Sequence, residues 1–338
     1  MNSIKIALCQ MNVVDNKDKN IEKAIQMIKE SKKQGANLAV LPEMFNCPYE
    51  NEKFIEYAER LEDSQTLNEI SNTAKEVNIH VLAGSVPELV KDDENDIESI
   101  YNTAVFFDND GKQLGKHRKM HLFDIDVKGK IYFKESDTLS AGNDFTIINT
   151  DLARIGIGIC YDIRFVELSR IMALNGAEIL IFPGAFNLTT GPAHWELLFR
   201  SRALDNQVYA IGVAPALDND ASYNSYGHSI AVNPWGEVIE ELDYSEELKI
   251  VEIDLDEIKR VRELGLTIRD YNEVVGDITK MFTTIGISGT HGKTTTSSLI
   301  RHILEDNGGC NYFIGAGDGY ATEENTYFVV ESDEFNRH

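Results

Sequence analysis

Cys160 has the residue type and the position of a catalytic nucleophile. It ends the glycine-spaced segment RIGIGIC and precedes RFVELSRIMAL, whose apolar residues recur at helical spacing. A thiol at a strand-to-helix turn lies near the positive end of the helix dipole, which favours the thiolate. The backbone N–H groups that follow point toward the place where an oxyanion would form. The alternative is a buried core cysteine, which is the commoner role of this residue.

Glu43 and Lys119 are candidates for a general base and for a cation that stabilises an oxyanion. Glu43 ends the apolar segment LAVLPE, and a buried carboxylate there needs either a partner or a catalytic task. Its alternative role is to cap the following helix. Lys119 stands in the cluster GKHRKMH after a predicted hairpin, where the alternative is a solvated surface. His117 and His121 have the i,i+4 spacing of a zinc pair, but without a third nearby ligand a polar loop is the simpler interpretation.

A glycine-rich turn near the end of the chain could hold phosphate. The segment ISGTHGKTTTSS places backbone N–H groups and a lysine at a predicted helix start, a common phosphate site. It departs from a Walker A loop, since Ile287 occupies the position of the first glycine. The candidate nucleotide-binding residues are Gly289, Thr290, His291, Gly292, Lys293, Thr294 and Thr295.

The elements that must position these residues alternate between strands and helices. Strand patterns include SIKIALCQM, NLAVLPE, IHVLAGSV, ARIGIGIC, AEILIFPG, QVYAIGVAP, HSIAVNPWGEVIEE and KIVEIDL. Helical patterns run from about residue 21 to Gly35, over 64–77, and from about Phe165 to Leu174. Two hairpin turns are predicted at DNDG and NTDLA. This order predicts an α/β fold with a mixed sheet.

The composition indicates which partners the protein does not bind and in which cellular compartment it lies. The 338 residues carry 56 acidic and 32 basic side chains, a net charge of -24, which argues against binding to nucleic acid or anionic membranes. No apolar run has the length of a membrane span or of a signal peptide core. The four cysteines lie far apart without a CxxC pair, which argues against a disulfide framework and fits the cytoplasm.

Six segments together resemble the ω-amidase branch of the nitrilase superfamily from about residue 3 to about residue 260. They are LPEMFNCPY, RKMHLFDID, GICYDIRFVEL, GAFNLTTGPAHWELL, RALDNQVY and GHSIAVNPWGEV. The resemblance implies a four-layer α-β-β-α sandwich that is a homodimer or a larger homo-oligomer. It also implies a catalytic triad of Glu43 as general base, Lys119 as oxyanion-stabilising cation and Cys160 as nucleophile. Glu135 in YFKES matches the second glutamate of the family, which orients the triad.

The implied reaction is amide hydrolysis through a thioester, with the Tyr161 N–H as a second oxyanion donor and with no metal or organic cofactor. The implied substrates are small monoamides of dicarboxylic acids, such as α-ketoglutaramate and succinamate. We expect Arg164 or Arg202, with Tyr49, to grip the free carboxylate, because arginine pairs with it through two hydrogen bonds. Each arginine could instead have a structural role. Phe186 and Thr190 are candidates for the pocket lining.

Residues from about 263 to 338 resemble a different family, the Mur ligases, and in particular their UDP-N-acetylmuramate–L-alanine ligases. The resemblance rests on TIGISGTHGKTTTSSLIRHILEDNG and YFVVESDEFNRH, and Glu331 or Glu334 would match the metal-binding acid of that family. We therefore predict a hydrolase domain over 1–262 and a truncated P-loop α/β fragment over 263–338. The fragment would use ATP and magnesium only if it were functional, and we expect it to be idle and loosely packed.

Three hypotheses follow, of which a cysteine amidase is the first. The second is an ATP-dependent amide ligase, which needs more of the Mur architecture than these residues supply. The third is a nitrilase-like scaffold without catalysis, which would have no need of Glu43, Lys119, Glu135 and Cys160.

Overall fold

The computed structural model describes residues 3–92, 97–127, 131–264, 280, 282–287, 293–305, 309–314, 318–320, 322 and 325–331. The chain divides into two compact units, Met1–Ile268 and Arg269–His338. The sequence prediction placed the boundary after residue 262. Helix α6 (Leu255–Glu263) spans that position and packs against β1 of the first unit.

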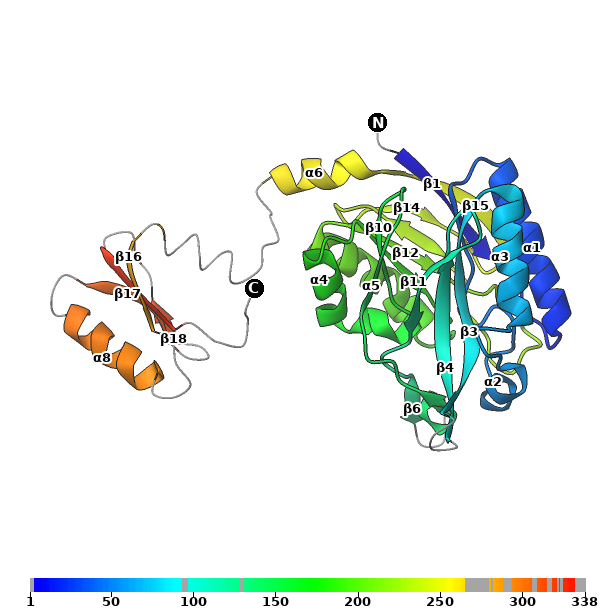
Figure 1. The fold of residues 1–338 in the computed structure, drawn as a ribbon, viewed down its shortest axis with the longest axis horizontal. Coiled ribbons are helices and arrows are strands. Elements are labelled where there is room, and N and C mark those ends of the chain that lie inside the picture. The colour runs from blue at the N-terminus through cyan, green and yellow to red at the C-terminus, as the bar shows by residue number, and fades with distance from the viewer. Residues whose placement is uncertain are drawn as a thin grey trace. The chain divides into compact units, whose positions relative to one another are not determined.

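Two sheets form the centre of the first unit (Figure 1). The seven-stranded sheet has the order β15-β1-β2-β3-β4-β5, with β8 paired to β4, and the six-stranded sheet has the order β14-β13-β12-β11-β10-β9. Strands β1, β2 and β3 are parallel, as are β10, β11 and β12, and their neighbours pair antiparallel. The strands of the first sheet are β1 (Ser3–Gln10), β2 (Leu38–Val40), β3 (His80–Asp92), β4 (Ile97–Phe107), β5 (Gln113–Arg118), β8 (Leu139–Ser140) and β15 (Glu247–Asp254). Those of the second are β9 (Thr146–Asn149), β10 (Arg154–Ile157), β11 (Ile179–Pro183), β12 (Tyr209–Val213), β13 (Ile230–Val232) and β14 (Val238–Glu241).

Helices cover the outer face of each sheet (Figure 1). Helices α1 and α3 pack on the first sheet, and α4 and α5 pack on the second. The resulting order of layers is helix, sheet, sheet, helix, as the resemblance implied. The helical elements are α1 (Lys17–Lys33), α2 (Asn51–Tyr57), α3 (Gln65–Val77), α4 (Val166–Leu174), α5 (Gly191–Asn206) and the short 3-10 turns η1 (Glu135–Asp137) and η2 (Cys160–Arg164). A separate hairpin joins β6 (Asp124–Val127) to β7 (Ile131–Lys134).

The period-two pattern of the strands builds two cores. In β1, Ile4, Ile6 and Leu8 face the second sheet, whereas Ala7 and Cys9 face α1 and α3. The same alternation runs through β2, β3 and β4, because successive side chains of a strand point to opposite faces. Both faces of this sheet are therefore buried, which is why these strands read as nearly continuous apolar runs.

The second unit contains a small sheet of order β16-β19-β17-β18 with α8 packed against it. Its elements are β16 (Thr283–Ile287), α8 (Lys293–Glu305), β17 (Cys310–Ile314), β18 (Asp318–Tyr320) and β19 (Tyr327–Glu331). Apolar side chains from β17 and β19 are buried under α8.

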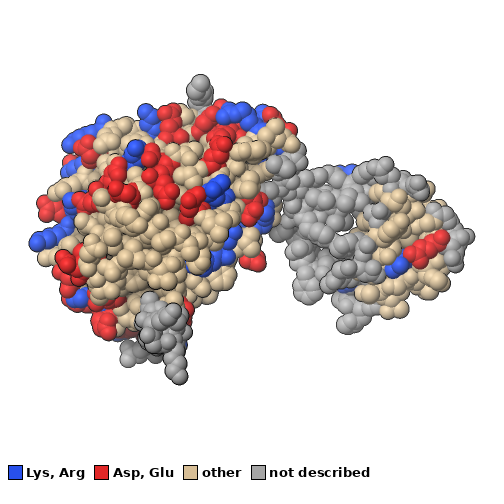
Figure 2. All heavy atoms as spheres, turned by 180° about the vertical axis from the view of Figure 1, so that it is seen from behind, with Lys and Arg blue, Asp and Glu red and all other residues tan. Residues whose placement is uncertain are grey.

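The surface of the larger unit is uneven in charge (Figure 2). Acidic and basic side chains are interspersed over part of the face in view, and a broad neighbouring area carries few charges. None of the described helices is both long enough and apolar enough to cross a membrane.

Candidate active site

Three charged side chains from separate elements meet inside the first unit. Glu43 follows β2, Lys119 follows β5, and Glu135 begins η1 after β7. The Lys119 Nζ lies 2.9 Å from Glu43 Oε1 and 2.8 Å from Glu135 Oε1, and all three residues are fully buried. The alternative of a solvated surface around Lys119 is therefore wrong, because the residue is fully buried.

The charge of Lys119 is held by its two neighbours. Burial disfavours an ammonium ion, but the negative charges of Glu135 and Glu43 raise the pKa of Lys119 well above its usual value. Burial raises the pKa of Glu135, and the nearby charge of Glu43 adds to this effect against the attraction of Lys119. The ammonium group of Lys119 is thus ion-paired with two carboxyl groups in a buried site, where water does not weaken the interaction.

The two oxygens of Glu43 have different surroundings. Oε1 accepts hydrogen bonds from Lys119 and from Asn102 Nδ2 at 2.8 Å. Oε2 accepts the backbone N–H of Ala185 at 2.7 Å. The carboxylate also lies near enough to the Cys160 thiol for its negative charge to raise the pKa of that thiol. Since Oε1 is already saturated with donors, Oε2 is the oxygen with room for the thiol proton.

Cys160 is held in an unusual backbone conformation. It begins η2 just beyond β10, with φ of 47°, in the left-handed region that costs energy for residues other than glycine. A Cβ on Gly184 would lie 3.2 Å from the Cys160 Cα, so the absence of a side chain there lets β11 approach the turn closely. The carboxyl ends of β2, β10 and β11 thereby deliver Glu43, Cys160 and Ala185 to one place.

The Cys160 sulfur is a thiol rather than a thiolate in this site. Burial raises its pKa well above the usual value, and the charge of Glu43 raises it further, while Lys119 has the opposite effect. The expected lowering by the helix dipole is therefore outweighed, because desolvation and a neighbouring carboxylate both disfavour a second negative charge. The sulfur must lose its proton during attack.

Asp162 fixes the turn that carries Cys160. Its carboxylate accepts the Ile159 N–H at 2.9 Å and lies 3.1 Å from His117 Nε2 and 2.7 Å from His121 Nδ1. These two histidines hold the pKa of Asp162 low against the effect of burial. Among the described residues no group of histidine, cysteine and acidic side chains has the arrangement of a metal site. His117 and His121 are thus partners of one carboxylate.

A hollow of about 200 Å³ opens beside the sulfur. Cys160, Tyr161, Arg164, Phe186 and Thr190 line it, together with Phe123, Ala185 and Tyr223. The guanidinium of Arg164 lies 5.1 Å from the centre of the Phe186 ring, and its Nη2 is 3.1 Å from His194 Nδ1. The buried Nε of Arg164 has no hydrogen-bond partner among the described residues, which leaves a donor for a ligand.

Tyr49 and Arg202 do not take the positions that we predicted for a carboxylate grip. The Tyr49 hydroxyl lies 2.5 Å from Glu135 Oε1 and 3.3 Å from Lys119 Nζ, so it belongs to the charged cluster. Arg202 donates to the backbone carbonyls of Ile163 and Arg164 at 2.8 and 3.0 Å. Arg202 therefore holds the η2 turn through its backbone, and it does not line the hollow beside Cys160.

The residues of the site that escaped the sequence reasoning include Asn102, Phe123, Asp162 and Tyr223. Asn102 is a polar residue within the strand pattern of β4, and a buried amide there is an indication of a task that could have been noticed. Asp162 lies only two residues from Cys160. Phe123 and Tyr223 come from loops, whose contribution to a pocket has no periodic signal.

The predicted phosphate loop is only partly described. Gly289, Thr290, His291 and Gly292 lie outside the described residues, as does Glu334. Lys293, Thr294 and Thr295 form the first turn of α8, where Thr294 and Thr295 are exposed. Glu331 ends β19. The nucleotide contacts therefore stay a prediction.

Comparisons with known proteins agree with the geometry of the first unit. Residues 5–263 match the carbon–nitrogen hydrolase family. The chain is 48% identical to omega-amidase NIT2 of Bos taurus and to that of Homo sapiens, over 78% of this chain and 93% of each relative. Among solved structures, Saccharomyces cerevisiae Nit3, described as a member of the nitrilase superfamily, superimposes with a TM-score of 0.72 at 39% identity, covering 80% of this chain and 96% of Nit3. The Caenorhabditis elegans NitFhit protein gives a TM-score of 0.70 at 31% identity, covering 86% of this chain and 69% of its own.

The match covers the four-layer unit and every residue of the charged cluster around the thiol. This chain is therefore a hydrolase of the carbon–nitrogen hydrolase family, in the nitrilase superfamily.

Proposed function

We propose that the protein is an ω-amidase that hydrolyses small monoamides of dicarboxylic acids, such as α-ketoglutaramate or succinamate, to the acid and ammonia. The observation that carries the proposal is the buried cluster in which Lys119 contacts Glu43 and Glu135 beside the Cys160 thiol, whose pKa the charge of Glu43 raises. The similarity to omega-amidases supports the choice of substrate class.

Acylation begins with Glu43 Oε2 taking the thiol proton as the sulfur attacks the amide carbon. A protonated thiol next to its base suits this step, because a free thiolate is not required before the substrate arrives. The negative oxygen that develops is stabilised by the Tyr161 N–H and by Lys119. Lys119 has three N–H donors, and the one directed to Tyr49 makes its longest contact, at 3.3 Å, so the oxyanion takes this donor.

Glu43 then returns the proton to the leaving nitrogen, the C–N bond breaks, and ammonia departs from a Cys160 thioester. Water attacks the thioester with Glu43 again as base, and the carboxylic acid is released as the sulfur regains its proton. Glu135 keeps Lys119 in place through its 2.8 Å contact and is itself fixed by the Phe123 N–H at 2.6 Å. The residues supply every proton transfer, so no cofactor is needed.

Arg164 is the group best placed to bind the second carboxylate of the substrate. Its unpartnered Nε and its position in the hollow with Thr190 and Phe186 support this role. Arg202 is excluded from the proposal because two backbone carbonyls occupy its guanidinium.

The other predicted roles have less support. A scaffold gains nothing from a buried lysine between two carboxylates, since such groups are held at a desolvation penalty. ATP and magnesium would enter only through the second unit. We also propose a cytoplasmic homo-oligomer without nucleic-acid or membrane partners, because all four cysteines are free and α5 exposes Leu197 and Leu204 to solvent.

The test is ammonia release from succinamate and α-ketoglutaramate with and without ATP, for the wild type and for Cys160→Ser. We expect ATP-independent release that is lost in Cys160→Ser and kept in Cys310→Ser, a matched change of another buried cysteine in the second unit. Hydroxylamine should divert the thioester to a hydroxamate. Release that depends on ATP and magnesium would favour the ligase, and release that survives in Cys160→Ser would remove the thiol from the mechanism.

A further inference from the structure

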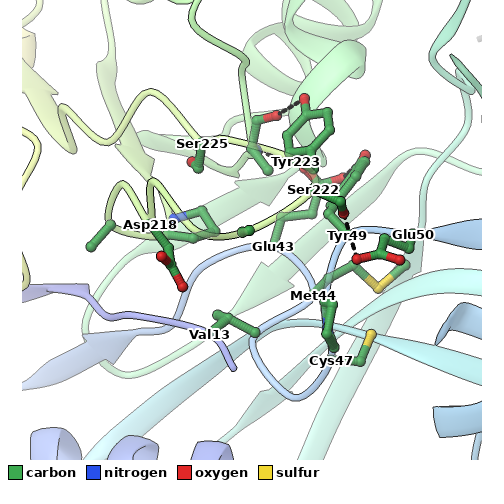
Figure 3. A pocket seen from close by; sticks show the side chains of 15 residues that line it. Val13, Glu43, Met44, Cys47, Tyr49, Glu50, Asp218, Ser222, Tyr223 and Ser225 are labelled. Carbon is green, nitrogen blue, oxygen red and sulfur yellow. Dashed lines mark hydrogen bonds between the residues drawn. The ribbon is translucent and has the colours of Figure 1, made fainter. Parts of the chain in front are cut away.

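A second hollow, of about 450 Å³, is lined in part by Glu43 (Figure 3). Glu43 and Tyr49 line it, as do residues of the two loops after β2 and β12. Ala185 and Tyr223 line both this hollow and the one beside Cys160, so the two hollows are neighbours. The mechanism above places the substrate in the hollow that contains the sulfur.

The two hollows differ in charge. Arg164 is the charged residue of the hollow beside Cys160. Among the described residues that line the second hollow are three carboxylates, Glu43, Glu50 and Asp218, and no lysine or arginine. In Figure 3, Asp218 and Glu50 stand on opposite sides of Glu43. An anionic substrate is attracted to the first hollow and repelled from the second, whereas a cation is attracted to the second.

A buried polar group inside the second hollow also indicates a ligand. Ser225 lines it and is only 5% exposed, and its hydroxyl has no hydrogen-bond partner among the described residues. A buried hydroxyl in a native protein is normally paired with protein or with a small polar molecule. A small molecule that offers N–H donors suits this hydroxyl and the carboxylates alike.

We propose that the second hollow is the passage through which the nitrogen product leaves, as ammonia that becomes ammonium at the acidic mouth. This inference rests on the proposed amidase function. Glu43 protonates the leaving nitrogen, so ammonia forms next to a residue that already lines the passage. The anionic acyl group stays on Cys160 in the other hollow, and the two products separate by charge.

The experiment compares two reactions that form the same thioester. Succinamate releases ammonia, whereas monomethyl succinate releases methanol by cleavage of the acyl C–O bond, with Glu43 protonating the leaving oxygen. Ala221→Phe fills the second hollow, which Ala221 lines. We expect the ratio of amide to ester turnover to fall at least fivefold. An unchanged ratio overturns the proposal.

The reverse of acylation tests the charge of the passage. ¹⁵N-ammonium enters the second hollow and gives a proton to solvent, and the resulting ammonia attacks the thioester. A C–N bond forms, the C–S bond breaks, and Glu43 passes the proton from nitrogen to sulfur, which gives ¹⁵N-labelled amide. We expect Asp218→Asn to raise the ammonium concentration for half-maximal exchange about three- to fivefold, as for the loss of one charge near a solvated cation.

Asp220→Asn is the matched control, because it removes the same charge from an exposed position in the same loop outside the hollow. It should leave the exchange unchanged, and equal effects of the two variants overturn the proposal. Asp218→Asn carries the test alone if Ala221→Phe does not fold. Failure of the proposed function is distinct, since the wild type would then release no ammonia.

Discussion

At the scale of single residues, the site depends on one cation shared by two carboxylates. Lys119 contacts Glu43 and Glu135 at 2.9 and 2.8 Å, and no side-chain atom of the three is exposed. Breaking such a buried group by removing one partner is far more damaging than its net contribution suggests, because charges remain without compensation. We therefore expect the cluster to stabilise the fold as well as to take part in the proposed reaction.

Lys119→Met should abolish ammonia release and lower the free energy of unfolding by about 3–5 kcal/mol. Both tryptophans, Trp195 and Trp235, lie in the first unit, so urea unfolding followed by tryptophan fluorescence reports on it alone. The double variant Lys119→Met/Glu135→Gln should recover part of the stability without activity. Equal stability of the single and double variants would show that the carboxylates do not repel each other.

A second buried carboxylate gives a prediction about pH. Glu88 accepts hydrogen bonds from Arg118, Lys116 and Thr103, which lower its pKa although burial has the opposite effect. A lowered pKa contributes stability above the pKa of the unfolded state, about 4.3, and this contribution is lost as the pH falls. Glu88→Gln should therefore cost about 1–3 kcal/mol at pH 7 and progressively less below pH 4.

The measurement is urea unfolding of wild type and Glu88→Gln at several values of pH, again by tryptophan fluorescence. Glu76→Gln is the control, since Glu76 pairs with Lys29 on the surface with 61% of its side chain exposed. It should change stability little at any pH. A Glu88→Gln deficit that does not depend on pH would contradict the assignment of this stability to the ionised carboxylate.

At the scale of elements, an irregularity in β3 positions Glu43, the proposed catalytic base. The pairing of β3 with β4 shifts register between Ala83 and Val86. Within this interval the Ser85 hydroxyl accepts the Met44 N–H at 2.9 Å, and the Ser85 N–H donates to the Pro42 carbonyl at 3.3 Å. The loop that carries Glu43 is thus anchored to β3 on both sides of the carboxylate.

Gly84→Ala should displace that loop. A Cβ at Gly84 would lie 1.8 Å from the Leu41 carbonyl oxygen and 2.5 Å from that of Pro42, so the backbone before Glu43 must move. We expect kcat to fall about 100-fold, the usual effect of a displacement of about 1 Å in a catalytic group.

Gly35→Ala is the matched control for kcat. Gly35 has φ of +86° and no neighbour within 4 Å of an added Cβ, so the change strains the end of α1 without touching the site. It should lower stability but keep kcat per folded molecule. A Gly84→Ala enzyme with wild-type kcat would contradict the anchoring role of β3.

At the scale of the whole molecule, an apolar surface on the first unit is the place where we expect the proposed subunits to associate. Leu197 and Leu204 of α5 are 63% and 49% exposed, and Trp235 is 46% exposed. Arg200 donates to the Gly236 carbonyl at 2.9 Å, which ties the loop of Trp235 to α5. Exposed apolar side chains that gather on one helix and its neighbouring loop are typical of a protein interface.

Leu204→Glu should therefore dissociate the oligomer, because a carboxylate buried between subunits has no partner. Sedimentation velocity measures the mass of the wild type and the variant at the same concentration. Ile55→Glu, an equal change at a 61% exposed position of α2, should leave the mass unchanged. An unaffected mass in Leu204→Glu would place the interface elsewhere.

The sequence by itself determined the types of reacting group. It also determined the apolar periodicity of the strands and helices that build the layers. Cys160, Glu43 and Lys119 are recognisable because each ends a strand or hairpin, where apolar runs give way to polar residues. Helix α5 was not predicted, because exposed leucines such as Leu197 place apolar residues outside its buried face and weaken the helical periodicity.

Tertiary structure alone decided which alternative holds for each residue. Lys119 is buried, and Arg202 donates to backbone carbonyls, because segments that are distant along the chain pack against these two residues. The protonated state of Cys160 follows from burial together with the charge of Glu43, which no local pattern encodes. Periodicity records which face of an element is apolar, whereas desolvation and hydrogen bonding depend on what packs against that face.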